Sequence, residues 1–181
     1  ERWLALPALK SLGYSINTTD DAQLQQAKDL LIESKKDLLA YDDTTFYSRL
    51  VSGEATEVVA WDGWCNYGTA ENPDIKFTVP KEGSDLWSDT MVILKSSQNK
   101  EAAHAFINFI LDPANHAWVA ENILYKVPNQ AAMDTPAVKD LNATYPNMGM
   151  TPTDLLQQEV VVDLGEDSVK YTDLATEVTS N

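Results

Sequence analysis

Apolar residues recur at helical spacing in several stretches of the chain, and turn residues separate these stretches. Side chains three and four positions apart lie on one face of a helix, so such stretches are predicted to be helices with one buried face. The predicted helices cover residues 2–12, 20–36, 99–111, 112–123, 151–159 and 167–178, with a short one that ends near Val51. In the helix at 99–111, the side chains predicted to point inward are Ala102, Ala105, Phe106, Phe109 and Ile110.

Short apolar runs lie between these helices. They predict strands at residues 38–41, 57–61 and 75–79, and a further extended segment at 87–94. Strands that alternate with helices are typical of βαβ units with a mostly parallel sheet. The expected fold class is therefore α/β, in which ligands bind beyond the carboxyl ends of the strands.

The composition indicates an acidic globular protein. The chain has 181 residues, of which 44% are hydrophobic, and a formal net charge of −15. Lys and Arg form no cluster, so no nucleic-acid partner is expected. The acidity favours either solubility or attraction of a cationic ligand. The single cysteine excludes an internal disulfide and a cysteine-based metal cluster, and no metal site is expected.

Aromatic residues followed closely by aspartate stand at the predicted strand ends. These groups are Tyr41 with Asp42 and Asp43, Trp61 with Asp62, and Trp87 with Asp89. An indole face attracts a cation by about 0.5 to 2 kcal/mol, and a charged hydrogen bond contributes about 1.5 to 3 kcal/mol. An alkylammonium ligand suits these surroundings. The alternative is structural, with the Trp side chains packed between layers and the Asp side chains capping turns.

Motifs of known enzyme classes are missing from the sequence. It contains no G-x-S-x-G, P-loop or G-x-G-x-x-G pattern, so the chain is not expected to be an enzyme or to hold a cofactor. The enzymatic alternative is a cation-dependent hydrolase that uses Asp42, Asp43 and Asp62.

Six local sequences follow one another in the order found in spermidine/putrescine-binding proteins. They are Leu-Gly-Tyr-Ser-Ile-Asn-Thr-Thr-Asp at 12–20, Trp-Asp-Gly at 61–63, Pro-Lys-Glu-Gly at 80–83, Leu-Trp-Ser-Asp at 86–89, Ala-Ala-His-Ala-Phe-Ile-Asn-Phe at 102–109 and Tyr-Lys-Val-Pro-Asn at 125–129. The chain therefore resembles this family over essentially its whole length.

This resemblance implies a periplasmic-binding-protein-like fold of type II with two lobes, of which the chain is about the second half. Glu1 is accordingly interpreted as a cut inside a longer protein. The implied division is 1–86 as a segment of the second lobe, 87–136 as a returning segment of the first lobe, and 137–181 as the final helices of the second lobe.

The family resemblance also implies a function. The protein would be an extracytoplasmic component of an ABC importer, periplasmic or at the cell surface, that captures putrescine or spermidine and delivers it to a membrane permease. The ligand-binding residues implied by the motifs are Trp61, Trp87, Asp89, Tyr125, Asp43 and Arg2. Trp87 would pack against the ligand, and Asp89 would pair with an ammonium group. Tyr125 would be the aromatic residue of a Gly-Tyr-x-x-Pro-Asn motif in which Leu124 replaces the glycine.

Two departures from the family pattern leave the ligand open. Trp3 stands where the family has Glu, and Val161 stands near the position of a polar ligand contact. The alternative function is the same fold with a different solute, such as another amine, an amino acid, a sugar or an iron complex. Because the cleft face of this half would be uncovered, the chain by itself is expected to dimerise or to bind ligand weakly.

Overall fold

The chain is built as two compact units. A computed structural model gives its structure and describes residues 2–180, so Glu1 and Asn181 lie outside the described residues. The first unit consists of residues 1–46, 79–87 and 151–181, and the second unit of residues 47–78 and 88–150. The chain therefore passes from one unit to the other more than once. The division into lobes that the family resemblance implies, at 1–86, 87–136 and 137–181, stays a prediction.

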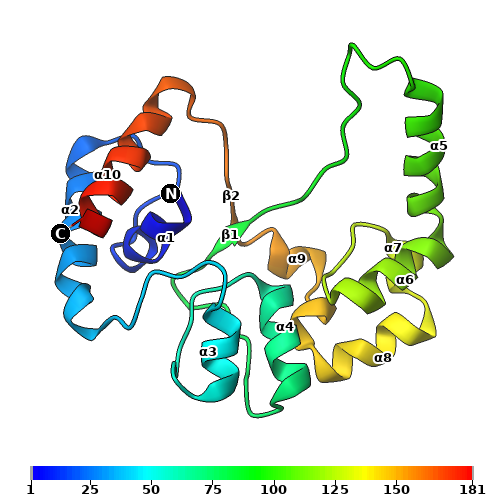
Figure 1. Cartoon of the computed structure of the whole chain (residues 1–181), viewed down its shortest axis with the longest axis horizontal. Coiled ribbons are helices and arrows are strands. Elements are labelled where there is room, and N and C mark those ends of the chain that lie inside the picture. The colour runs from blue at the N-terminus through cyan, green and yellow to red at the C-terminus, as the bar shows by residue number, and fades with distance from the viewer. Residues whose placement is uncertain (1, 181) are drawn as a thin grey trace. The chain divides into compact units, whose positions relative to one another are not determined.

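Helices make up most of the regular structure (Figure 1). In chain order the elements are α1 (Arg2–Ser11), α2 (Asp21–Ser34), η1 (Lys35–Asp37), α3 (Phe46–Ser52), α4 (Asp62–Glu71), β1 (Asp85–Leu86), α5 (Lys100–Leu111), α6 (Pro113–Ile123), α7 (Gln130–Met133), α8 (Pro136–Thr144), η2 (Pro146–Gly149), α9 (Pro152–Leu155), β2 (Glu159–Val160), η3 (Gly165–Asp167) and α10 (Ser168–Ser180). Among residues 2–180, no helix is long and apolar enough to cross a membrane.

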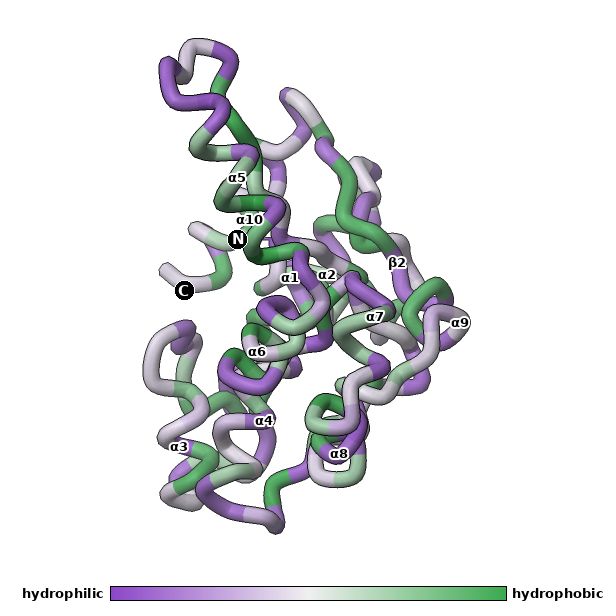
Figure 2. Tube along the Cα trace, turned by 90° about the vertical axis from the view of Figure 1, so that its right-hand side faces the viewer, coloured by the Kyte–Doolittle hydropathy of each residue, from purple (hydrophilic) through white to green (hydrophobic). Residues whose placement is uncertain are grey.

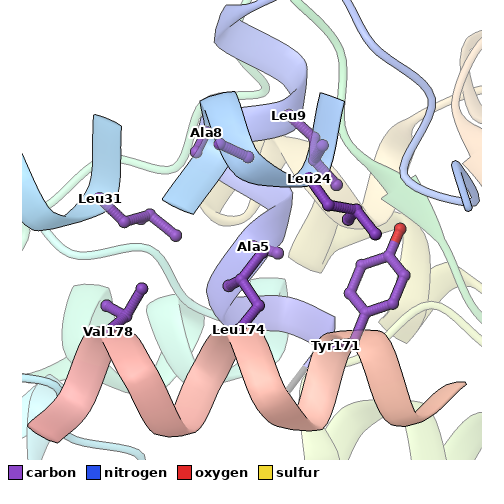
Figure 3. Close-up of a cluster of buried hydrophobic side chains, with 9 residues drawn as sticks. Ala5, Ala8, Leu9, Leu24, Leu31, Tyr171, Leu174 and Val178 are labelled. Carbon is purple, nitrogen blue, oxygen red and sulfur yellow. The ribbon is translucent and has the colours of Figure 1, made fainter. Parts of the chain in front are cut away.

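Helices α1, α2 and α10 form the core of the first unit. Figure 3 shows side chains from all three pointing toward one another. The buried members are Ala5, Ala8, Leu9, Leu24, Ala27, Leu31, Tyr171, Leu174 and Val178. The Tyr171 hydroxyl lies within hydrogen-bonding distance of the carbonyls of Ile16 and Thr18, at 3.0 and 2.9 Å. This contact fixes the start of α10 against the loop between α1 and α2.

The second unit has a separate core built from α6, α7, α8 and η2. Its buried side chains are Ala117, Ala120, Val127, Ala132, Met133, Val138, Tyr145 and Met148. Burial of an aliphatic or aromatic side chain stabilises a fold by about 1.5 to 3 kcal/mol, so each unit has its own source of stability.

The strongly periodic helices agree with the sequence prediction. The Asp20 carboxylate accepts a hydrogen bond from the Gln23 N–H at 2.9 Å and caps α2 at the start of the predicted helix. Leu24, Ala27 and Leu31 are buried on one face of this helix, at the spacing that helical periodicity requires. Asp112 caps α6 in the same way, with proline at the first helical position.

The predicted strands at 38–41, 57–61 and 75–79 are wrong for the described residues. The one pairing found within residues 2–180 is parallel and joins β1 to β2, with Asp85 opposite Glu159. A strand needs a neighbouring strand to receive its backbone hydrogen bonds, and apolar periodicity alone does not supply one. These segments, and the extended segment at 87–94, therefore lie outside any ladder in this chain.

Helix α5 forms as predicted, but its apolar face is not buried. Phe106 and Phe109 keep 59% and 60% of their surface exposed, and green hydrophobic stretches are visible along α5 in Figure 2. Ala102 and Ala105 are exposed as well, and Ile110 is half-buried. Among residues 2–180, α6 is the main helix packed against α5, and it leaves this face uncovered. The inward orientation predicted for the face is therefore wrong.

Helices α4, α7 and α8 of the second unit were not expected from the sequence. Helix α4 contains two glycines, which weaken its intrinsic helix propensity, and contacts with the end of α6 hold it instead. Helix α8 lies in a stretch whose prolines predict loops. There Pro136 occupies a first helical position, where its fixed backbone angle is favourable.

Glu159 of β2 is bonded to several groups at the beginning of the chain. It forms an ion pair with Lys10 at 2.6 Å and also accepts hydrogen bonds from the Ser15 hydroxyl, the Ile16 N–H and the Asn17 amide. Burial raises the pKa of this carboxyl, but the hydrogen bonds and the Lys10 charge outweigh burial and lower the pKa from 4.5 to about 2. Glu159 thus joins β2 to α1 and its following loop.

Replacing Glu159 with Gln removes this charge. Because the folded-state pKa lies below the ordinary value of 4.5, the carboxylate contributes stability that is full above that pH and is lost as the pH falls toward 2. We expect Glu159→Gln to lower the free energy of unfolding near neutral pH by about 2 kcal/mol, and by progressively less as the pH drops. Urea unfolding of both proteins, from neutral pH down to acid pH, measures this loss of stability. Glu166→Gln removes an exposed carboxylate of the same unit as the control. A loss that does not depend on pH would contradict the prediction.

Candidate functional site

Several aromatic and acidic residues of the second unit lie around the N-terminus of α4. Trp61 is the N-cap residue of this helix and Asp62 is its first residue. The Tyr125 ring lies directly on the buried Gly63, because a Cβ atom added there would fall 2.0 Å from Tyr125 Cε2. No real side chain tolerates that distance, so glycine is what allows the ring to approach the helix backbone.

Leu124 directs Tyr125 onto α4. It ends α6 in the left-handed conformation, with φ 54°, which costs a residue other than glycine about 1 to 2 kcal/mol. The Leu124 side chain packs against the core of the second unit. In addition, its carbonyl accepts a hydrogen bond from the Asn66 amide at 2.7 Å, and the Ile123 carbonyl accepts one from the Tyr67 hydroxyl at 2.9 Å. The left-handed backbone gives a physical reason for the glycine that the family motif has at this position.

The Tyr125 phenol lies in an acidic and partly buried environment. Burial raises its pKa most, followed by the charge of Asp62 and by Tyr67, while a hydrogen bond from the Trp64 N–H lowers it. The charge of Asp89 raises the pKa further, and the net result is a pKa of about 12. Tyr125 is therefore neutral at physiological pH, and both carboxylates lie near enough to act on it.

Three of the six predicted ligand residues belong to this second unit. Trp61 is half-buried, Tyr125 is half-buried on Gly63, and Asp89 is exposed. The structure thus places an aromatic ring and the nearby charges of Asp62 and Asp89 around one helix end. The role of these residues in ligand binding remains a prediction.

Arg2, Asp43 and Trp87 belong to the first unit. Trp87 directly follows β1 and is half-buried, whereas Asp43 is exposed in the segment before α3. Arg2 donates hydrogen bonds to the carbonyls of Val162 and Ile16, at 2.6 and 3.0 Å. The Arg2 guanidinium therefore joins the loop after α1 to the segment after β2, both in the first unit.

The sequence pattern places Asp62 beside Trp61 as a candidate for cation binding, as a turn cap or as part of a hydrolase, but it gives no indication of Asn147. The Asn147 amide donates a hydrogen bond to Asp62 Oδ2 at 3.1 Å, across 85 positions of sequence. Such a distant contact leaves no local signal. Within residues 2–180, no three His, Cys, Asp or Glu side chains come together in a group that could hold a metal ion.

The Gly63→Ala substitution tests whether Tyr125 needs this glycine. The new methyl group would overlap the ring, so the ring has to move, and we expect a loss of about 1 to 3 kcal/mol in the free energy of unfolding. Gly68→Ala in the same helix is the control, since its nearest neighbour would be Ile75 Cδ1 at 3.4 Å. Alanine is the better helix former, so the control is expected to be neutral or slightly stabilising. Urea unfolding compares the variants, and equal stabilities would contradict the account.

The chain matches solved structures and curated proteins with related names. A putative spermidine/putrescine ABC transporter from Listeria monocytogenes is 32% identical with a TM-score of 0.85, over 98% of this chain and 55% of that chain. The corresponding substrate-binding protein of Streptococcus pneumoniae, solved with calcium and HEPES, is 30% identical with a TM-score of 0.80. The match covers 99% of this chain and 55% of that chain. These structures confirm the expected periplasmic-binding-protein fold class, of which the chain covers about half.

Curated relatives agree with this. The spermidine/putrescine-binding periplasmic protein of Escherichia coli K12 is 33% identical over 142 residues, which are 77% of this chain and 41% of that protein. The putrescine/cadaverine-binding protein of Pseudomonas aeruginosa is 30% identical over 148 residues, which are 77% of this chain and 42% of that protein. The chain thus spans about two fifths of the length of these relatives.

A family profile described as bacterial extracellular solute-binding protein matches residues 8–148, well over half of the chain. Proteins of this kind bind solutes outside the cytoplasm, which confirms the expectation of a binding protein rather than an enzyme and of an extracytoplasmic location. The chain belongs to the family of bacterial extracellular solute-binding proteins.

Proposed function

We propose that the full-length protein captures a polyamine, putrescine or spermidine, outside the cytoplasm and delivers it to the permease of an ABC importer. The observation that carries this proposal is the α4 terminus of the second unit, where Tyr125 lies near the carboxylates of Asp62 and Asp89. An aromatic face and carboxylates attract an alkylammonium group, and neither favours an anion.

The names of the relatives support the same ligand class. Those with similar sequences are named for spermidine, putrescine or cadaverine, all of which are aliphatic amines. The alternative of another solute, such as a sugar or an iron complex, is less well supported by these names. The hydrolase alternative has no support from the family.

The remaining ligand residues are part of this proposal. Trp87 would wall the methylene chain and Asp89 would pair with one ammonium group, while Asp43 and Arg2 would make further polar contacts. The lobe division at 1–86, 87–136 and 137–181 is likewise proposed on the family pattern.

Asp89→Asn and Trp87→Ala test the ligand site in the full-length protein. Asp89→Asn removes a charged hydrogen bond, so we expect putrescine affinity to fall by about 10- to 100-fold. Trp87→Ala removes an aromatic ring from the ligand site and is expected to lower putrescine affinity about tenfold. Trp87→Phe keeps a ring and is expected to lower the affinity less. Isothermal titration with putrescine and spermidine at low and moderate salt measures both effects.

Asp74→Asn is the matched charge control, because Asp74 is exposed elsewhere in the second unit. Unchanged affinity in both Asp89→Asn and Trp87→Ala would exclude these residues from the ligand site. No heat with either amine in the wild-type protein would move the function to another solute.

We also propose that the 181-residue chain by itself self-associates through the apolar surface of the second unit. Large side chains exposed there are Val92, Leu94, Phe106, Phe109 and Trp118. Exposed apolar patches of this kind tend to be covered by a partner.

Light scattering of the purified chain tests this association. We expect a dimer or larger species, and a shift toward monomer when Phe106 and Phe109 are both replaced by Ser. Val169→Ser removes an apolar side chain of the first unit that is 56% exposed, and should leave the mass unchanged. A monodisperse monomer of the unmodified chain would contradict the proposal.

A further inference from the structure

The contact between Asp62 and Asn147 sets the chemistry of the α4 terminus. Asn147 lies in η2 and is only 5% exposed, and its Nδ2 donates to Asp62 Oδ2 at 3.1 Å. A carboxylate only accepts hydrogen bonds, so the nitrogen of the amide must face Asp62 and the assignment of Oδ1 follows. Asn147 Oδ1 is therefore the acceptor atom of an amide whose nitrogen is bonded to the Asp62 carboxylate.

This acceptor atom is unsatisfied. Asn147 Oδ1 is buried and has no hydrogen-bond partner within the part of the chain that the structure describes. Buried polar atoms of native proteins nearly always have a partner, so an unpaired oxygen on an amide bonded to a carboxylate indicates a missing donor. A primary ammonium group offers three N–H donors and no acceptor, which matches two neighbouring acceptors.

The surroundings favour a cation at this point. The negative charge of Asp62 acts on the Tyr125 phenol and on the Cys65 thiol, and it raises the pKa of both groups in addition to the larger effect of burial. The Tyr125 ring lies on Gly63, next to Asp62 in the sequence, and an aromatic face attracts an ammonium group. The nearby Lys126 ammonium donates to the Met148 carbonyl at 3.1 Å, and so it is directed to the backbone.

We propose that Asp62 and Asn147 bind one primary ammonium group of the ligand, and that Asp62 is a specificity-determining residue for diamines. This inference rests on the proposed amine-binding function and gives Asp62, already near Tyr125 in that proposal, the specific role of binding one ammonium group. Asp89 and Asp62 then each receive one ammonium group of a diamine, whereas a monoamine needs only one of them.

Isothermal titration of the full-length protein with putrescine and with n-butylamine tests the proposal. Asp62→Asn keeps the size of the side chain and removes its charge. We expect putrescine affinity to fall by about tenfold or more, with a much smaller change for n-butylamine, so the preference for the diamine collapses. A merely structural role of Asp62 would weaken both amines equally.

Two further variants complete the test. Glu71→Gln removes the same charge at the opposite end of α4 and should keep the diamine preference of the wild type. Asn147→Ala removes the unpaired acceptor and should reduce that preference by about threefold or more, which keeps the proposal testable if Asp62→Asn fails to fold. A preference retained in both Asp62→Asn and Asn147→Ala would overturn the inference alone. If the wild-type protein binds neither amine, the proposed function itself is wrong.

Discussion

The second unit depends on one close approach, that of the Tyr125 ring to the backbone of α4 at Gly63. A helix N-terminus leaves backbone N–H groups without partners, and the Tyr125 oxygen accepts one of them from Trp64. The same approach keeps the phenol near Asp62 and next to the turn that ends α6. The packing of Tyr125 and the acidic surroundings of the proposed site therefore both depend on the absence of a side chain at position 63.

The first unit is held by a different kind of interaction. Its three helices share an apolar core, but two charged residues attach the returning segment at 159–162 to the beginning of the chain. Glu159 binds Lys10 and the loop after α1, and Arg2 binds the carbonyl of Val162. Segments far apart in sequence are thus fixed by hydrogen bonds to charged groups, which are stronger than those between neutral groups.

How much could be predicted from the sequence depended on how local each signal was. Helices α2, α6 and α10 carry their periodicity within a few residues, α2 and α6 also have local caps, and all three form where expected. The strand segments failed because a ladder requires a partner that periodicity cannot specify, and α4 was missed because its stability comes from contacts with α6. The family motifs predict Trp61, Asp89 and Tyr125 as ligand residues, whereas Asn147 depends on a contact across 85 positions and has no local pattern.

The central claim is that the protein recognises its ligand as a cation. Titration calorimetry of the full-length protein with putrescine and with 1,4-butanediol tests this most directly, because the two molecules share a four-carbon chain and differ in charge. The account predicts that the diamine binds, more weakly at higher salt, and that the diol does not bind measurably. Equal binding of both molecules, or binding of the diol alone, would contradict it.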